Sequence, residues 1–236
     1  MRKTVHVTFF IIGSVLGAQA QTLIPRVGLT VSSLATEEVD NGITAETNNE
    51  TNTGFTFGVG YNVPVSTLGK VMFSLQPEMN YIQKGFKGTS TGEFNIGEQI
   101  FEFHAKNEHT INYLEIPVLA RFEYGGDKFK VHVHAGPSVG FGLGGKYKSE
   151  STVDTGETIE VYKSEGKIRF YDADEEDVIA FDHNVDFGWQ GGAGVTFMNR
   201  ITLDIRYGMS LTDLHHDAKT KNRAAQFTIG VPLSLN

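Results

Sequence analysis

Large apolar and small polar residues alternate along most of this chain, and this two-residue period constrains the fold more than any other feature. Between Gly54 and Val63 the sequence reads GFTFGVGYNV, so Phe, Val and Tyr share one face while Gly, Thr and Asn share the other. Such alternation is typical of a β-strand with one face in an apolar medium. Eight segments alternate in this way, at 26–32, 54–63, 73–81, 113–122, 129–141, 186–197, 201–210 and 226–235.

The residue types on the two faces decide the class of β-protein. In a soluble barrel or sandwich, bulky apolar residues fill the interior. Here one face is uniformly bulky and apolar, while the other is mainly Gly, Ser and Thr with charges of both signs. Balanced charges suit the lumen of a narrow barrel, where ion pairs satisfy one another, and the bulky face then contacts lipid. The predicted lumen network comprises Arg26, Glu78, Glu115, Arg121, Lys130, His132, His134, Asp186, Asp204 and Arg206.

The sequence therefore predicts an all-β protein, an eight-stranded antiparallel up-and-down transmembrane β-barrel. Eight strands leave an interior just wide enough for side chains, so we expect a filled lumen and no bulk channel. The composition agrees, because 27 Gly suit the crowded face and 17 Phe suit the lipid face, while the mean hydropathy of −0.20 averages both. The alternative is a soluble lipid carrier with the two faces reversed.

The connections between predicted strands alternate between long and short. Short links lie at 64–70, 124–128 and 198–200, and long loops lie at about 35–53, 85–110, 144–184 and 213–224. Outer-membrane barrels have short periplasmic turns and long extracellular loops, so both chain ends are expected on the periplasmic side. Within the loops, alternation predicts a β-hairpin turning at Glu165-Gly166 and an extension of the fourth strand at 99–103.

Residues 1–20 have the three parts of a secretory signal peptide. Met1-Arg2-Lys3 precedes an apolar stretch that ends in Ala18-Gln19-Ala20, which predicts cleavage between Ala20 and Gln21. The apolar stretch is too short for a spanning helix, which needs about 20 residues. The mature domain is then 21–236, located in the outer membrane, and loss of the two basic residues changes its net charge from −8 to −10.

Several function classes are excluded by composition. Without cysteine the chain can form no disulfide, thiolate zinc site, cysteine nucleophile or cysteine lipid anchor. Its acidic balance argues against a nucleic-acid partner, because phosphates are neutralised by clustered Lys and Arg. The acids concentrate in two predicted outer loops: 35–53 has five acids and no base, and 144–184 has eleven acids and five bases.

Four segments resemble the PorT-type outer-membrane β-barrel family, which is typical of Gram-negative bacteria of the Bacteroidota. They are FSLQPEMNYIQKG from Phe73, YLEIPVLARFEY from Tyr113, HAGPSVGFGLGGK from His134 and DIRYGMSLTDL from Asp204. The resemblance implies a small integral barrel, and the family's named member is an accessory of type IX secretion. The chain departs from many such barrels at its end, Ser234-Leu235-Asn236, where those barrels carry a Phe that the assembly machinery reads.

Histidines provide the weak metal candidates. His132 and His134 are two apart on one predicted strand, so both face the lumen at a spacing that suits a metal, with Glu115 and Arg121 on the preceding strand. We expect them to belong to a structural polar network, because the sequence offers no clear third ligand. A metal site and a catalytic His–Glu pair are the alternatives.

The predicted outer loops hold two further candidates. His215-His216-Asp217 is expected to be solvated, with a metal site or a hydrolase dyad at the outer rim as the alternative; Ser210 and Thr212 precede it without a motif that positions a nucleophile. The acidic run 172–177 lacks the glycine and spacing of a calcium loop.

The function expected from the sequence is that of a non-enzymatic outer-membrane protein without a cofactor. Its partners are expected to be membrane lipid, lipopolysaccharide and a protein at the acidic outer loops, with a role in envelope structure or interaction. The alternatives are an accessory of protein secretion and an enzyme that modifies outer-membrane lipid.

Overall fold

The described part of the chain consists almost entirely of β-strands. In a computed structural model, the described residues are 21–36, 45–96, 99–154, 158–170, 178–181, 183–213 and 220–235. The predicted signal peptide, with Ala20, and the terminal Asn236 lie outside them. The strands are β1 (Gln21–Thr36), β2 (Ala45–Leu68), β3 (Val71–Ile96), β4 (Gln99–Gly126), β5 (Phe129–Asp154), β6 (Ile159–Phe170), β7 (Val178–Phe181), β8 (Val185–Phe197), β9 (Ile201–Ser210), β10 (Thr220–Gly230) and β11 (Leu233–Leu235). Among these residues there is no helix of the length and apolar character needed to cross a membrane.

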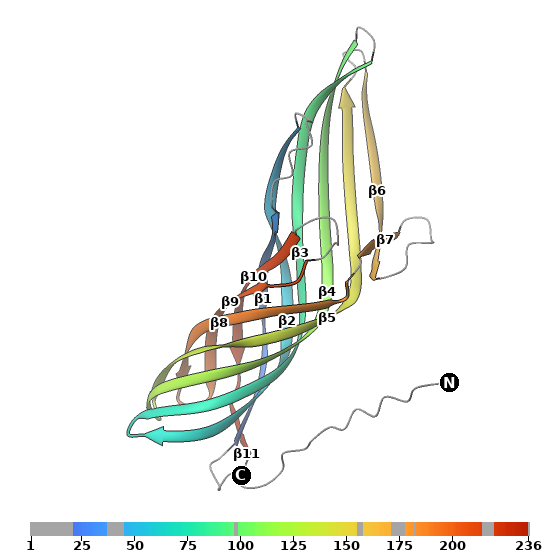
Figure 1. The fold of residues 1–236 in the computed structure, drawn as a ribbon. Coiled ribbons are helices and arrows are strands. Elements are labelled where there is room, and N and C mark those ends of the chain that lie inside the picture. Colours follow the sequence, from blue (N-terminus) through green and yellow to red (C-terminus); the bar gives the residue numbers. More distant parts are fainter. Residues whose placement is uncertain are drawn as a thin grey trace, which may run out of the picture.

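Eight strands close into a ring of antiparallel neighbours, which confirms the predicted barrel (Figure 1). The order is β1–β2–β3–β4–β5–β8–β9–β10, and β10 pairs with β1 to close the ring. β11 also pairs with β1 and places Leu235 opposite Gln21, so both ends of the described chain lie at the end with the short turns. One such turn contains Gly69 at φ +62°, a conformation that glycine adopts without steric cost.

The faces of the barrel strands are oriented as predicted. Val27 and Leu29 on β1 are 58% and 59% exposed, whereas the neighbouring Arg26 is 8% exposed and points into the lumen. The lumen is crowded enough to require glycine in places: a Cβ at Gly58 would lie 2.2 Å from Asn80 Oδ1 and 2.4 Å from the Met79 carbonyl oxygen. The alternative of a soluble carrier with an apolar interior is wrong, because the apolar side chains lie outside.

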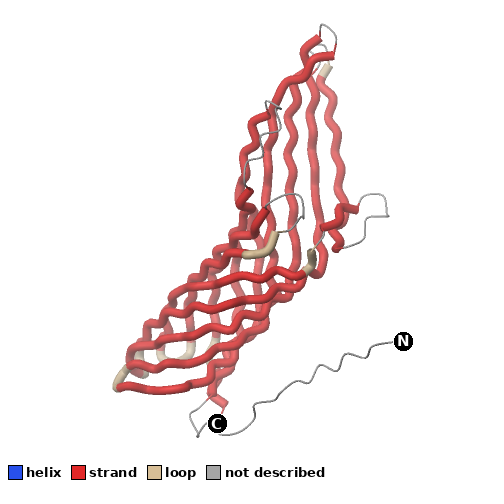
Figure 2. Tube along the Cα trace, in the orientation of Figure 1, coloured by secondary structure: helices blue, strands red, loops and turns tan. Residues whose placement is uncertain are grey.

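Five strands continue beyond one end of the barrel as a tall sheet (Figures 1 and 2). This raised sheet consists of 45–51 of β2, 83–96 of β3, 99–112 of β4, 145–154 of β5 and all of β6. The loops expected at about 85–110 and 144–184 are thus corrected, since they are largely strand. A spanning strand needs about 10 residues, whereas β4 has 28, so most of its first half lies beyond the barrel.

The polarity of the two strand faces reverses where the raised sheet begins. Along β3 the inward side chains change from Glu78 and Asn80 to the fully buried Ile82, and the next outward residue is Gln83. Ile82, Ile111, Tyr113 and Ile168 form an apolar core with Leu34, Tyr147 and Phe170 packed against it. The base of the raised sheet therefore has an apolar cluster inside, as in a water-soluble β-protein, next to the buried and charged Lys84.

The turn predicted at Glu165-Gly166 is wrong, while the predicted extension at 99–103 is confirmed as the start of β4. β6 runs through Glu165 and Gly166 without a turn, because β5 offers a continuous antiparallel partner from Gly145 to Asp154. Gly166, where the turn was predicted, lies opposite Tyr147 of β5 within this continuous pairing. The short β7 then pairs in parallel with the end of β6.

Candidate functional site

The ten predicted lumen residues lie on six strands and point into the barrel. Nine are buried, and Lys130 has a side chain that is 25% exposed at the end with the short turns. β1 supplies Arg26, β3 Glu78, β4 Glu115 and Arg121, β5 Lys130, His132 and His134, β8 Asp186, and β9 Asp204 and Arg206. The side chains reach each other because eight strands enclose a lumen only as wide as the side chains themselves.

Glu78 is the centre of the lumen network. Its two carboxylate oxygens accept from both Nη atoms of Arg206 at 2.7 and 3.2 Å, and Arg26 Nη1 lies 3.0 Å from Oε1. Gln76 and Asn80 donate to the same carboxylate at 2.6 and 2.9 Å. One buried carboxylate thus joins two guanidinium groups from β1 and β9 to β3.

A second cluster lies nearer the raised sheet and centres on Lys84. Its Nζ lies 2.7 Å from Glu115 Oε1 and 3.3 Å from Asp186 Oδ2. Gln190 donates to Glu115 at 2.6 Å, and Ser210 donates to Asp186 at 2.8 Å. A cavity of about 10 Å³ remains beside this cluster, room for roughly one water, so the lumen is filled at this level.

The third cluster lies at the end with the short turns. Arg121 and Lys130 lie 2.7 and 3.1 Å from the two oxygens of Glu123, and Arg121 also donates to Gln76 at 3.1 Å. Both Glu123 and Lys84 are missing from the predicted network. The two-residue period points to them, because Lys84 continues the series Glu78, Asn80, Ile82 and Glu123 follows Arg121 by two.

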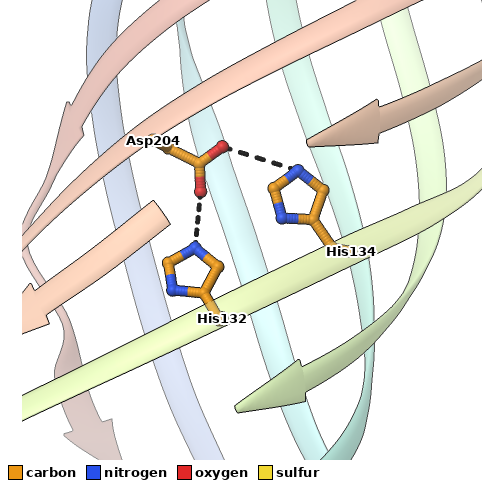
Figure 3. Close-up of side chains that lie close together, drawn as sticks. All are labelled: His132, His134 and Asp204. Atoms are coloured by element: carbon orange, nitrogen blue, oxygen red, sulfur yellow. Dashed lines mark hydrogen bonds and ion pairs between the residues drawn. The ribbon is translucent and has the colours of Figure 1, made fainter. Parts of the chain in front are cut away.

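The two histidines on β5 meet Asp204 on β9 (Figure 3). Nε2 of His132 lies 2.8 Å from Asp204 Oδ2, and Nε2 of His134 lies 3.5 Å from Oδ1. The sequence identified all three residues as lumen-facing but did not bring Asp204 to the histidines. The alternative of a catalytic His–Glu pair is not supported by a contact between Glu115 and either histidine. Glu115 instead accepts hydrogen bonds from Lys84 and Gln190.

The candidates near the outer rim are only partly described. His215, His216 and the run 172–177 lie outside the described residues. Ser210 and Thr212 both donate to Asp186, at 2.8 and 3.1 Å, so their hydroxyl groups belong to the Lys84 cluster. Ser210 is buried in the lumen and faces away from lipid.

The raised sheet has one histidine in its interior. The ring of His109 stacks on Phe86 with centroids 4.4 Å apart and lies 6.3 Å from that of Tyr147. Burial lowers the pKa of His109, because the charged imidazolium loses its hydration, and Nδ1 has no hydrogen-bond partner. His109 is therefore a neutral packing residue of the raised sheet.

The raised sheet also has an open edge along β6. Residues 159–166 pair with β5 on one side, while β7 covers only 167–170 on the other, so within the described chain their outer edge is unpaired. Ile159, Val161 and Tyr162 on this edge strand are 67%, 52% and 58% exposed. An unpaired strand edge with exposed apolar side chains is a template for an added strand.

The described geometry agrees with the comparisons to known proteins. The sequence model of the outer membrane protein beta-barrel domain matches residues 18–216. No curated protein is similar enough in sequence to count as a match.

Several solved structures are similar to this chain at low sequence identity. Ail, the attachment invasion locus protein of Yersinia pestis, is 10% identical with a TM-score of 0.38 and covers 91% of this chain and 99% of its own. The outer membrane enzyme PagL is 13% identical with a TM-score of 0.43, covering 90% and 99%. OprG from Pseudomonas aeruginosa is 12% identical with a TM-score of 0.38, covering 93% and 99%. These similarities concern the fold alone.

Proposed function

Because this chain belongs to the outer membrane protein beta-barrel domain family, we propose that it is a non-enzymatic envelope protein that binds a protein partner through its raised sheet. In this proposal the short turns face the periplasm and the raised sheet projects outward from the cell. The bulky outer face of the barrel contacts membrane lipid, and the binding surface on β6 lies within the acidic segment 144–184.

The open edge of β6 is the observation that carries the proposal. The base of the raised sheet is packed, since Ile82, Ile111 and Ile168 form an apolar cluster there and are at most 1% exposed. The β6 edge lies beyond this cluster and makes no strand pairing with the barrel wall. The β6 edge offers backbone groups to a partner in extended conformation, and the mixed charges of Glu160, Lys163 and Glu165 accompany them.

Site-specific photo-crosslinking in intact cells tests this proposal. A photoreactive amino acid replaces Tyr162 on the β6 edge, and the matched control replaces Tyr207, a tyrosine that is 47% exposed on the lipid face of β9. We expect a protein adduct from position 162 and none from position 207. Absence of a protein adduct at position 162, with the barrel correctly folded, would overturn the proposal.

An accessory role in secretion is the second candidate, and the four PorT-type segments favour it. They lie on β3, β4, β5 and β9, so the resemblance spans the barrel wall rather than one loop. A secretion accessory predicts that cargo fails to reach the cell surface when the gene is deleted. Normal cargo delivery in the deletion strain rejects it.

A lipid-modifying enzyme is the third candidate, and it depends on the adjacent histidines at the predicted outer rim. The paired substitutions His215→Ala and His216→Ala then change the mass spectrum of lipid A in a strain that carries the variant. An unchanged spectrum removes the enzyme and leaves the interaction barrel intact.

A further inference from the structure

We propose that His132, His134 and Asp204 form a binding site for a transition-metal dication, with zinc as the best match, inside the barrel lumen. This site is independent of the raised sheet and goes beyond an interaction role. Four features of the structure support it: the geometry of the three ligands, their unpaired atoms, the glycines that make room for them and the charges around them.

The three side chains bring three possible metal-ligand atoms close together (Figure 3). One nitrogen from each histidine and one carboxylate oxygen all lie within 4.8 Å of one another. Zinc binds nitrogen and oxygen at about 2.0–2.2 Å, so adjacent ligands in a tetrahedron are about 3.3 Å apart. His132 Nε2 lies 2.8 Å from Oδ2 of Asp204 and His134 Nε2 lies 3.5 Å from Oδ1, so each imidazole is near that spacing from one oxygen of the carboxylate.

Two of these atoms are buried without a hydrogen-bond partner. Nε2 of His134 and Oδ1 of Asp204 both lack one, although the side chain of His134 is 0% exposed and that of Asp204 is 4% exposed. Leaving a polar atom buried and unpaired costs free energy, so such atoms point to a missing partner. A dication between them satisfies both atoms at once.

Glycines on β8 create the space for the histidines. β8 lies between β5 and β9, and its Gly194 is paired with His132 on one side and with Asp204 on the other. A Cβ at Gly194 would lie 2.6 Å from the His132 ring, and a Cβ at Gly192 would lie 2.8 Å from His134 Nε2. Only glycine at these two positions lets both imidazoles cross β8 toward the carboxylate on β9.

The surrounding charges leave Asp204 as the least neutralised carboxylate among the described lumen residues. Glu78, Glu115, Glu123 and Asp186 each have a Lys or Arg nitrogen within 3.3 Å. The Lys or Arg nitrogen given for Asp204 is Arg206 Nη2 at 3.7 Å, and both Nη atoms of Arg206 already donate to Glu78. A metal bound by two neutral imidazoles supplies the positive charge that Asp204 lacks.

The site lies close to an opening at the end of the barrel that carries the short turns. A cavity of about 280 Å³ is lined there by Arg121, Glu123, Lys130 and Thr196, among others. Lys130 is two residues before His132 on the same lumen face of β5. The cavity therefore ends one step along the lumen face of β5 from His132.

Metal titration of the folded mature protein in detergent tests the site. Calorimetry with Zn²⁺ is expected to give one ion per barrel, and Co²⁺ is expected to give the intense visible absorption of a tetrahedral nitrogen–oxygen site. His134→Gln removes a ligand, and we expect binding to weaken at least about tenfold. The matched control His109→Gln removes a half-buried histidine of the raised sheet and leaves binding unchanged.

Two further variants separate this site from other sources of binding. The paired His215→Ala and His216→Ala substitutions are expected to leave the Zn²⁺ affinity unchanged, and Gly194→Ala is expected to weaken it by displacing the His132 ring. Retention of the heat-modifiable gel shift shows which variants fold. If His134→Gln does not fold, X-ray absorption of zinc-loaded protein carrying the His215→Ala and His216→Ala substitutions must still show two imidazoles and a carboxylate. The proposal is overturned if the wild-type protein does not bind Zn²⁺, or if folded His134→Gln binds it with wild-type affinity. It is also overturned if the paired His215→Ala and His216→Ala substitutions abolish binding.

Discussion

Replacing Glu78 by Gln is the sharpest test of how the lumen network contributes to stability. The change keeps the side-chain shape but removes the charge that both Arg26 and Arg206 face at 2.7–3.2 Å. Removing one partner of a buried ion pair costs about 3–5 kcal/mol, because the other partner stays buried and uncompensated. We expect Glu78→Gln to lie in this range, since its side chain is 0% exposed and two guanidinium groups lose their acceptor.

Urea unfolding of the barrel in lipid vesicles measures this effect, with the gel shift of folded protein as the signal. With a slope of about 2 kcal/mol per molar urea, the expected loss lowers the midpoint by about 2 M. The matched control is Glu150→Gln, which breaks an ion pair with Lys163 of similar length, 3.1 Å, whose side chains are 51% and 69% exposed. An exposed pair contributes at most about 1 kcal/mol, so this control stays near wild type.

A double-mutant cycle then separates the ion pair from general disruption. When Arg26→Gln is combined with Glu78→Gln, one of the two unpaired guanidinium groups is gone, and we expect a coupling energy of about 1–3 kcal/mol between positions 26 and 78. If Glu78→Gln costs no more than Glu150→Gln, or if the cycle shows no coupling, then the network does not stabilise the barrel in the way argued here.

Three further changes test other parts of the structure. Val133→Arg places a charge on the lipid face near the middle of the barrel part of β5, 129–141, and should cost about 2–4 kcal/mol by urea unfolding. Val161→Arg on β6 should change stability by less than about 0.5 kcal/mol. Met198 adopts φ +50° in the turn before β9 and is 68% exposed, so Met198→Gly should raise the midpoint by relieving about 1 kcal/mol of strain; a lower midpoint contradicts this. Because the pKa of His109 is lowered, its contribution to the stability of the raised sheet is present above about pH 6.5 and is lost as the pH falls. Protease cleavage of the raised sheet should therefore increase on acidification, and the increase should be smaller in His109→Gln.

The barrel was predictable because its two faces meet different solvents. Each barrel strand has to place bulky side chains in lipid and small or charged ones in a narrow lumen. The residue type alone therefore predicts that Phe57 faces lipid and that Gly58 faces the lumen. Neighbour pairing then follows from short turns such as Gly69-Lys70, which leave an up-and-down order as the simplest path. Strand number and direction are local consequences of the pattern.

The raised sheet was not predictable in the same way because it leaves the lipid. Beyond Ile82 and Ile111 the outward residues of the strands are polar. If the inward residues are assumed to be polar as in the barrel, such a segment is polar on both faces and is assigned as a loop. The alternation persists there with its polarity reversed, and Gln83 and Asn112 mark the level of the reversal on β3 and β4. A strand that crosses from lipid into water has one alternation of apolar and polar residues in the barrel and the opposite alternation beyond it. A prediction based on the barrel alternation alone therefore ends the strand where the polarity reverses.

The histidine site shows why contacts across two strands escape a strand-by-strand analysis. His132 and Asp204 are 72 residues apart, and the segment between them includes β6 and β7, which pair outside the barrel ring. Their meeting depends on β8 lying between β5 and β9 and on its register, which puts Gly194 in the same row as both side chains. Glycine on the central strand is nevertheless a sequence signal. A lumen-facing Gly-x-Gly on β8, between His-x-His on β5 and Asp-x-Arg on β9, leaves space above β8 into which the longer side chains of both neighbours extend. Applied to consecutive barrel strands, this rule locates side-chain clusters from the glycines that make room for them rather than from the ligands alone.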